Sequence, residues 1–350
     1  MLIGHSWPLA LGRGHHDPVS ELTRSILPWH LGVPGIAVSL FFFLSGLLIT
    51  RSYLQRGNLL DFLEARVLRL YPALIVCVGI CVLGVGLVLT SLPAGHYLGH
   101  QSTQSYLIHN TTLVAGIDFW LPGLFADLPF KGINGSLWTL PYEVWMYLCA
   151  ATLGVLTILR RRWLFNVLFV ATLCAYGLDI GIPDLTGVKF ERLGIFFLLG
   201  AFVYVNASAV RLSPIALALF LFAAWAAFKS PAYPLLGAGA LAYAFLLVSF
   251  HPSLRLPNMD RVGDFSYGTY VYAFPVQQTV IHQLDNPGPW LTCLVSLLSV
   301  TPVAAASWYG IERPMLRFKG SAARLWNASF PRHAGRSPMP ATGGEGAAGQ

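Results

Sequence analysis

The sequence Val38-Ser-Leu-Phe-Phe-Phe-Leu-Ser-Gly-Leu-Leu-Ile49 is an apolar run without a charge, and a second apolar run opens at Tyr71-Pro72. The segment between them contains Arg51, Arg56, Arg66 and Arg69. An apolar run, a basic segment and another apolar run are typical of a chain that crosses a membrane and turns back. Because arginine is costly in hydrocarbon and is retained on the cytoplasmic side, the pattern predicts the orientation of both neighbouring helices. Four guanidinium groups in one short connection also suit bidentate phosphate binding, so the segment is a candidate anion site.

The composition is that of a membrane protein. Of the 350 residues, 55% are hydrophobic and only 11% are charged, and the mean hydropathy is +0.61. Soluble domains carry about a quarter charged residues, so a polytopic membrane protein is favoured. The net charge of +7 does not predict nucleic acid binding, because the basic residues lie between apolar segments, where positive-inside orientation explains them. The five cysteines all lie within apolar runs, which indicates neither a disulfide framework nor a metal cluster.

A bilayer span takes about 20 apolar residues, and this length divides the chain into successive helices. We expect helices at residues 1–12 (partial), 33–50, 70–91, 138–159, 163–181, 191–208, 212–228, 233–250, 265–284 and 289–311. The fold class is therefore all-α, a polytopic membrane protein of about ten transmembrane helices. Residues 92–137 form a long connection, in which residues 106–117 are apolar enough for an interfacial or re-entrant helix.

The distribution of basic residues supports this arrangement. With the Arg51–Arg69 segment inside, 16 of the 22 Lys and Arg residues lie in inner segments and 6 in outer ones, which predicts ten helices with both termini cytoplasmic. The apolar start at Met1 lacks the basic region and the cleavage site of a signal peptide; it resembles a helix whose inner half is missing, as a start codon set too far downstream would produce. After residue 318 the chain becomes rich in Gly, Ala, Pro and Ser, which predicts a disordered cytoplasmic tail at 319–350.

His5 is the first candidate for chemistry. A histidine within or at the edge of a membrane helix is costly unless it has a partner or a task, and neutral imidazole is an effective base near neutral pH. The alternative is a histidine at the outer interface that faces water. His15, His16 and His30 in the following loop are weaker candidates. Two adjacent rings do not easily point at one centre, so no metal site is expected at His15-His16.

A second polar group lies at the outer end of the fourth expected helix. Its sequence is Asn134-Gly-Ser-Leu-Trp-Thr-Leu-Pro-Tyr-Glu143. Trp138 and Tyr142 are ordinary residues of a membrane interface. Glu143 lies inside the apolar run, where a carboxylate needs a partner, so it is a functional candidate. Asn134 and Ser136 add hydrogen-bonding groups, and such groups beside aromatic faces suit a sugar.

The pair Arg66-x-x-Arg69 precedes Pro72 at the inner membrane surface. If a helix begins before Pro72, the spacing of three places both guanidinium groups on one helix face. An anion site is one interpretation, and positive-inside anchoring is the other.

Two charged segments are expected to have local structural roles. Asp264, two residues before Ser266, is expected to cap a helix. Glu312 and Arg313 are expected to form a local charge pair at the end of the tenth helix, which Pro314 closes.

Together these segments resemble the acyltransferase type 3 family of integral-membrane acyltransferases. The matching segments, in family order, are His5-Ser6, Phe41-Phe-Phe-Leu-Ser-Gly-Leu-Leu-Ile49, Arg66-x-x-Arg69-x-Tyr-Pro72, Asn134-Gly-Ser-Leu-Trp-Thr-Leu-Pro-x-Glu143, the run Gly263–Pro275, and Ile311-Glu-Arg-Pro314. Each is weak alone, but six in order are specific, and they cover residues 1–318. Two positions depart from the family: its arginine upstream of the histidine would lie before Met1, and Ala273 stands where many members carry histidine.

The resemblance implies a membrane-bound acyltransferase domain at residues 1–318 in a bacterial inner (plasma) membrane. It implies transfer of an acyl group, often acetyl, from cytoplasmic acyl-CoA to a hydroxyl of a carbohydrate or glycolipid. The roles expected on this basis are His5 as base or acyl relay with Glu143 as the next catalytic candidate, Arg66, Arg69 and Arg51 for the donor, and Asn134, Ser136, Trp138 and Tyr142 for the acceptor. No hydrolase-like domain follows the tenth helix, so the domain is expected to act alone or with a separate partner protein.

The alternative function is that of a transporter or polysaccharide exporter, in which the same buried polar residues would line a path for solute. No inverted repeat in the sequence supports it. A purely structural membrane protein would leave His5 and Glu143 unexplained.

Overall fold

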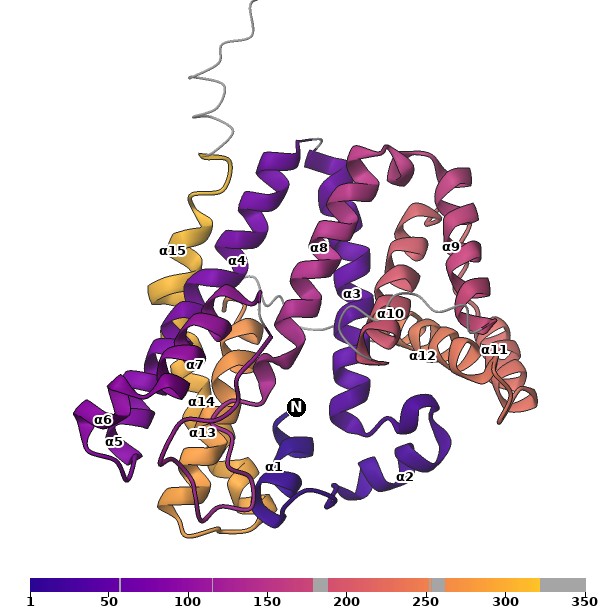
Figure 1. Cartoon of the computed structure of the whole chain (residues 1–350). Coiled ribbons are helices and arrows are strands. Elements are labelled where there is room, and N and C mark those ends of the chain that lie inside the picture. The colour runs from indigo at the N-terminus through magenta and orange to yellow at the C-terminus, as the bar shows by residue number, and fades with distance from the viewer. Residues whose placement is uncertain (57, 115, 179–187, 252, 254–261, 322–350) are drawn as a thin grey trace, which may run out of the picture.

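The computed structural model describes residues 1–56, 58–114, 116–178, 188–251, 253 and 262–321, and the regular structure in this part of the chain is entirely helical (Figure 1). The elements are α1 Leu2–Leu11, α2 Pro18–Ile26, η1 Pro28–His30, α3 Val33–Arg56, α4 Leu59–Gly79, η2 Ile80–Gly86, α5 Leu87–Leu89, α6 Ala94–Gly99, α7 Gln101–Thr112, η3 Ser136–Thr139, α8 Leu140–Val155, η4 Ile158–Arg160, α9 Arg162–Gly177, α10 Val188–Val205, α11 Pro214–Ala226, α12 Tyr233–Ser249, α13 Ser266–Gln283, α14 Pro289–Ser307, η6 Trp308–Glu312 and α15 Arg313–Leu316. Each expected range contains a helix, and the all-α class is confirmed. The expected tail lies outside the described residues from 322 onward.

Three helical segments of the described chain are long and apolar enough to cross a membrane. They are Val33–Arg56, Leu59–Leu89 and Pro289–Leu316. Shorter apolar helices accompany them, among them α9, α11 and α12. These elements fit an integral membrane protein. The number of spans, about ten, stays a prediction.

The basic segment at residues 51–69 is mostly helical rather than an open loop. α3 continues to Arg56, and α4 begins at Leu59 instead of residue 70. The side-chain oxygen of Asn58 accepts a hydrogen bond from the N–H of Leu60 at 3.0 Å and so caps α4. The expected ranges ended where the apolar runs end, whereas a capped helix extends into polar sequence. We call this end of the helix bundle, at the top of Figure 1, the arginine end.

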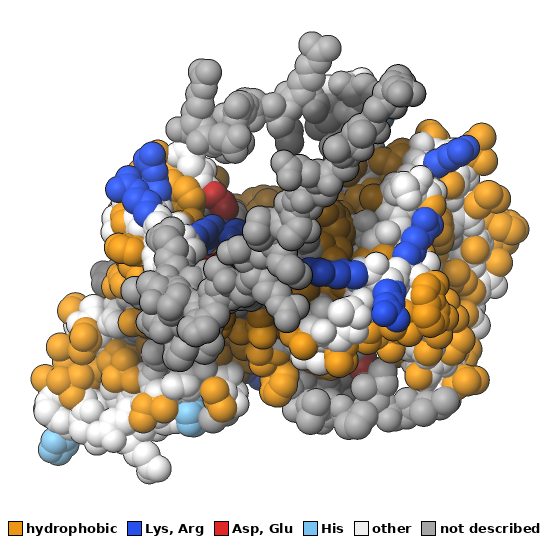
Figure 2. Space-filling model, turned by 90° about the horizontal axis from the view of Figure 1, so that it is seen from above, with side chains coloured by type: hydrophobic (Ala, Val, Ile, Leu, Met, Phe, Trp, Pro, Cys, Tyr) orange, Lys and Arg blue, Asp and Glu red, His pale blue; other side chains and the backbone are white. Residues whose placement is uncertain are grey.

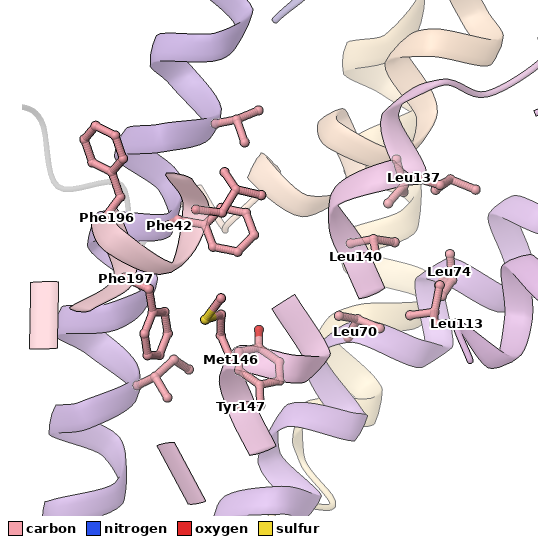
Figure 3. Close-up of a cluster of buried hydrophobic side chains, with 14 of the residues drawn as sticks. Phe42, Leu70, Leu74, Leu113, Leu137, Leu140, Met146, Tyr147, Phe196 and Phe197 are labelled. Atoms are coloured by element: carbon pink, nitrogen blue, oxygen red, sulfur yellow. The ribbon is translucent and has the colours of Figure 1, made fainter. Parts of the chain in front are cut away.

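α3 and α10 pack closely at two glycines. A Cβ atom added to Gly46 would lie 1.9 Å from the carbonyl oxygen of Phe197, and one added to Gly200 would lie 1.9 Å from that of Phe43. Small residues let the backbones of membrane helices approach in this way. The apolar core surrounds this contact, and Figure 3 shows side chains of α3, α4, α8 and α10 meeting within it.

α1 lies between two parts of the bundle (Figure 1). On one side it packs on α13 and α14, where Gln277 donates hydrogen bonds to the carbonyl oxygen of Leu2 at 2.9 Å and to Ser6 Oγ at 2.8 Å. On the other side it meets the start of α3, where a Cβ atom added to Gly4 would lie 2.3 Å from Pro34. We call this region, with α1, α2 and η1, the histidine end.

The long connection at residues 92–137 contains two helices. α7 occupies residues 101–112 instead of the expected 106–117, and it packs against α4. It ends at Leu113, whose φ of 60° is left-handed. Two hydrogen bonds of 2.9 Å then join the side chain of Asn110 to the backbone of Asp118, so the chain after α7 folds back onto it.

We expect Gly46→Ala and Gly200→Ala each to lower the free energy of unfolding by about 1–3 kcal/mol, because the added methyl meets rigid backbone. Gly79→Ala on α4 is the matched control, since its Cβ would meet nothing within 4 Å. Thermal unfolding of the purified protein in detergent measures the effect. Equal melting temperatures for all three variants would contradict the close approach of α3 and α10.

Candidate active site

The arginine end is held by an ion cluster around Arg69 of α4. Its two terminal nitrogens bind Asp264 Oδ2 at 2.6 Å and Glu312 Oε2 at 3.1 Å. Glu312 is almost fully buried, and its other oxygen accepts a hydrogen bond from Ser307 at 3.0 Å. The cluster joins α4 to the segment before α13 and to the end of η6, the short helix that follows α14. Arg69 is therefore neutralised by two carboxylates of the chain itself.

Asp264 both caps α13 and binds Arg69. Its Oδ1 accepts the backbone N–H of Ser266 at 3.1 Å, which confirms the expected capping role. Burial alone would raise the pKa of the Asp264 carboxyl, but the Ser266 hydrogen bonds and the charge of Arg69 outweigh it and hold that pKa below its ordinary value.

The expected pair of Glu312 with Arg313 is wrong. Glu312 binds Arg69, from a distant part of the sequence, whereas the Arg313 guanidinium lies over the ring of Tyr309 at 6.0 Å. Pro314 does not end the helical region, because it lies in the first turn of α15. A buried carboxylate takes the partner that tertiary packing brings to it, not its neighbour in the chain.

Arg66, one turn before Arg69 on α4, has no carboxylate bonded to it among the described residues. It donates to Ser52 Oγ at 3.1 Å, and its guanidinium lies 5.8 Å from the ring of Tyr147. The Tyr147 hydroxyl donates to a carboxylate oxygen of Glu143, a side chain that is only 7% exposed. Arg66, Tyr147 and Glu143 thus form a polar line from the arginine end into the core. Tyr147 is drawn there in Figure 3.

Further positive groups gather around Arg66. Arg56 donates from Nε to the same Ser52 Oγ at 3.2 Å. Burial, together with the positive charges of Arg66, Arg56 and Arg69, lowers the pKa of Lys319. Arg51 lies exposed on α3. Figure 2 looks onto this end and shows Lys and Arg side chains on both flanks of the face and near its centre.

The segment at 134–139 is tied into the protein by hydrogen bonds. Asn134 donates to the carbonyl oxygen of Val271 at 2.9 Å and accepts from the N–H of Ser136 at 3.1 Å. Tyr270 of α13 bonds with its hydroxyl to the carbonyl oxygen of Ser136 and to Thr139. Asn134 and Ser136 are both buried. The side chain of Asn134 and the backbone of Ser136 connect the segment before α8 to α13. Acceptor binding by Asn134 and Ser136 stays a prediction.

The other two expected acceptor residues form an aromatic pair. The rings of Trp138 and Tyr142 meet edge to face, with centroids 5.7 Å apart. Tyr142 also lies 6.2 Å from the ring of Phe190 on α10. This pair connects the start of α8 with the start of α10.

His5 lies on α1 beside a cavity at the histidine end. Its ring meets Phe274 of α13 edge to face at 5.5 Å, and its Nε2 is buried without a hydrogen-bond partner among the described residues. The cavity has a volume of about 310 Å³ and is bordered by α1, α2, η1 and the starts of α3 and α10. We call it the His5 cavity. A buried imidazole nitrogen without a partner is available for proton transfer.

Arg192 lines the same cavity from α10, a position that was not predicted for it. In the sequence it is one of the six outer basic residues. Its position just inside an apolar helix was the signal that could have marked it, since a charge there is costly without a task. His16 and His30, expected as weaker candidates, also line the cavity. No group of three or more metal-binding side chains occurs in the described part of the chain.

Comparison with known proteins identifies the family. A family model described as an acyltransferase domain matches residues 1–309. The chain belongs to the acyltransferase type 3 family. The resemblance found in the six motifs is confirmed, and the protein is an acyltransferase enzyme.

Two curated relatives are similar to this acyltransferase along most of their length. An O-acetyl transferase of Shigella phage Sf6 is 28% identical over 323 residues, which cover 86% of this chain and 91% of the relative. Nodulation protein 10 of Rhizobium leguminosarum bv. viciae is 28% identical over 353 residues, which cover 92% of this chain and 91% of the relative. No solved structure matches the chain.

We expect the two carboxylates that bind Arg69 to differ in their effect on stability. Glu312 is 1% exposed, and Glu312→Gln removes one of the two negative charges that neutralise Arg69. Because this charge pair is buried on the Glu312 side, we expect the free energy of unfolding to fall by about 3–5 kcal/mol. Asp264 is 51% exposed, so Asp264→Asn should lower the free energy of unfolding by at most about 1 kcal/mol. Thermal unfolding of the acyltransferase in detergent compares them. A larger loss for Asp264→Asn would show that the cluster is organised differently.

Proposed function

We propose that this acyltransferase transfers an acyl group, acetyl in the simplest case, from cytoplasmic acyl-CoA to a hydroxyl of a carbohydrate or glycolipid at the membrane. Membership of the family supports acyl transfer, and the relative named O-acetyl transferase supports a hydroxyl acceptor. The acyl–sulfur bond of the thioester breaks and an acyl–oxygen ester bond forms. The acceptor hydroxyl loses its proton, and coenzyme A leaves as a thiol after taking up a proton.

The environment of His5 is the main support for the proposal. Its Nε2 has no hydrogen-bond partner among the described residues, and its side chain borders a cavity of about 310 Å³. Neutral imidazole accepts a proton from a hydroxyl and also acts as a nucleophile toward acyl groups. In the proposal His5 is therefore the acceptor-activating base or a brief carrier of the acyl group. Glu143 is the next candidate for the base.

The donor is proposed to bind at the arginine end. Coenzyme A is anionic, and Arg66, Arg56 and Lys319 provide positive charge that no direct carboxylate contact neutralises among the described residues. Guanidinium groups bind phosphate bidentately. Arg69 differs, because its two salt bridges occupy it; its proposed role is to hold the site together. Arg51 lies exposed at the same end and adds to the positive field.

The proposal predicts that His5→Ala abolishes O-acylation. Loss of a positioned base costs ~10²–10⁴-fold in rate, and His5→Gln, which cannot carry the proton, should be nearly as inactive. His15→Ala is the matched control, since His15 is exposed and does not border the cavity. The assay is acyl transfer to carbohydrate in membranes, with acyl-CoA binding measured in parallel. If His5→Ala acylates near the wild-type rate, His5 is not the base, and Glu143 is tested next.

For donor binding we expect Arg66→Ala to weaken acyl-CoA affinity by about 1.5–3 kcal/mol, the contribution of a charged hydrogen bond. Arg66→Lys should restore it only in part, because lysine keeps the charge but lacks the planar fork. Arg161→Ala is the control: this arginine is exposed on the connection between α8 and α9. Titration calorimetry in detergent measures the affinities. If Arg66→Ala binds acyl-CoA as tightly as the wild type, the arginines only orient the helices in the membrane and do not bind the donor.

A further inference from the structure

The titratable side chains that line the His5 cavity are all basic. They come from α1, the connection after it, α2, η1 and α10. They are His5, His16, Arg24, His30 and Arg192. No carboxylate lines the cavity in the part of the chain that the structure describes. Asp17, which follows His16 in the sequence, is buried and accepts hydrogen bonds from the N–H and the hydroxyl of Ser20 at the start of α2.

Arg192 is the central feature of this lining. Its Nε is buried without a hydrogen-bond partner, and the described residues contain no salt bridge to it. Arg192 is half-buried, and a guanidinium that is partly removed from water without an anion is costly, so proteins normally pair such a group. Arg69, the comparable arginine at the other end, has two carboxylates. Within the described residues Arg192 therefore has no counter-ion, which is a reason to expect an anionic ligand.

The position of Arg192 connects it to the proposed chemistry. It lies in the first turns of α10 and borders the same cavity as His5 on α1. Trp29, which also borders the cavity, is held against Phe196 of α10 and has a left-handed φ of 55°. Non-glycine residues in this backbone region are uncommon and concentrate at binding sites. The cavity therefore combines a base, a cation and an aromatic ring.

We propose that the His5 cavity binds an anionic acceptor, with Arg192 as the counter-ion of a phosphate or carboxylate group on the carbohydrate. Arg192 binds the anionic oxygens, Arg24 adds positive potential, and His5 meets the hydroxyl that is acylated. This inference rests on the proposed function and adds the class of acceptor. A neutral sugar would bring no counter-ion to Arg192, so the proposed site selects against it.

The test compares matched acceptors with the full-length protein in detergent. Three synthetic versions of one carbohydrate are used: neutral, bearing a sugar carboxylate, and linked to a lipid through phosphate. We expect the wild type to prefer one anionic version over the neutral one by roughly 10–100-fold in kcat/KM, as a charged hydrogen bond predicts. The version preferred identifies the source of the anion.

Arg192→Gln should reduce that preference to roughly one, mainly through KM, and Arg192→Lys should restore part of it. Arg13→Gln is the control, because Arg13 is an exposed arginine of the histidine end whose guanidinium lies over Phe130, away from the cavity. Retention of the preference by Arg192→Gln, or equal use of all three acceptors by the wild type, overturns the inference.

A binding measurement separates this inference from the proposed function. The anionic carbohydrates alone should raise the melting temperature of the wild type but not of Arg192→Gln. Stabilisation without any acyl transfer would support the anion site and contradict the proposed function. Acyl transfer with equal use of neutral and anionic acceptors would support the proposed function and overturn the anion site.

Discussion

One guanidinium group joins three segments that lie far apart in the sequence. Arg69 on α4 binds Asp264 ahead of α13 and Glu312 at the end of η6, which follows α14 directly. Because Glu312 is buried, its charge is tolerated only with this partner. α13 and α14 are the helices on which α1 packs, and Phe274 of α13 contacts the ring of His5. The ion cluster at the arginine end thus holds the helices that position the histidine at the other end.

The two ends differ in how their positive charge is balanced. At the arginine end, Arg69 is neutralised, whereas Arg66 points its guanidinium toward Tyr147, whose hydroxyl binds Glu143 in the core. At the histidine end, Arg192 has no anion at all among the described residues. Moving a charged donor into an apolar core such as that of Figure 3 costs a large free energy. If the donor binds at the arginine end and the acceptor at the histidine end, as proposed, only the acyl group has to move between them.

The sequence predicted most of the candidate site residues one by one, but not which of them lie together. His5 and Glu143 stood out because a polar side chain in an apolar run needs a reason. Arg66 and Arg69 stood out by their spacing, yet the sequence did not distinguish them. Their difference depends on Asp264 and Glu312, which are separated from α4 by most of the chain. In the sequence Arg192 is only one of the outer basic residues. Its place beside His5, and the lack of a salt bridge to it among the described residues, depend on the tertiary structure.

The sequence alone determined the helical class, the positions of most helices and the family. Apolar runs of this length become helices because a backbone in lipid must satisfy its own hydrogen bonds. Tertiary structure decided which groups meet: Glu312 with Arg69 instead of Arg313, Gly46 with the backbone of α10, and Arg192 with His5 around one cavity. These contacts join helices across long separations in the chain. Their energies depend on burial and distance, which no local pattern of residues specifies.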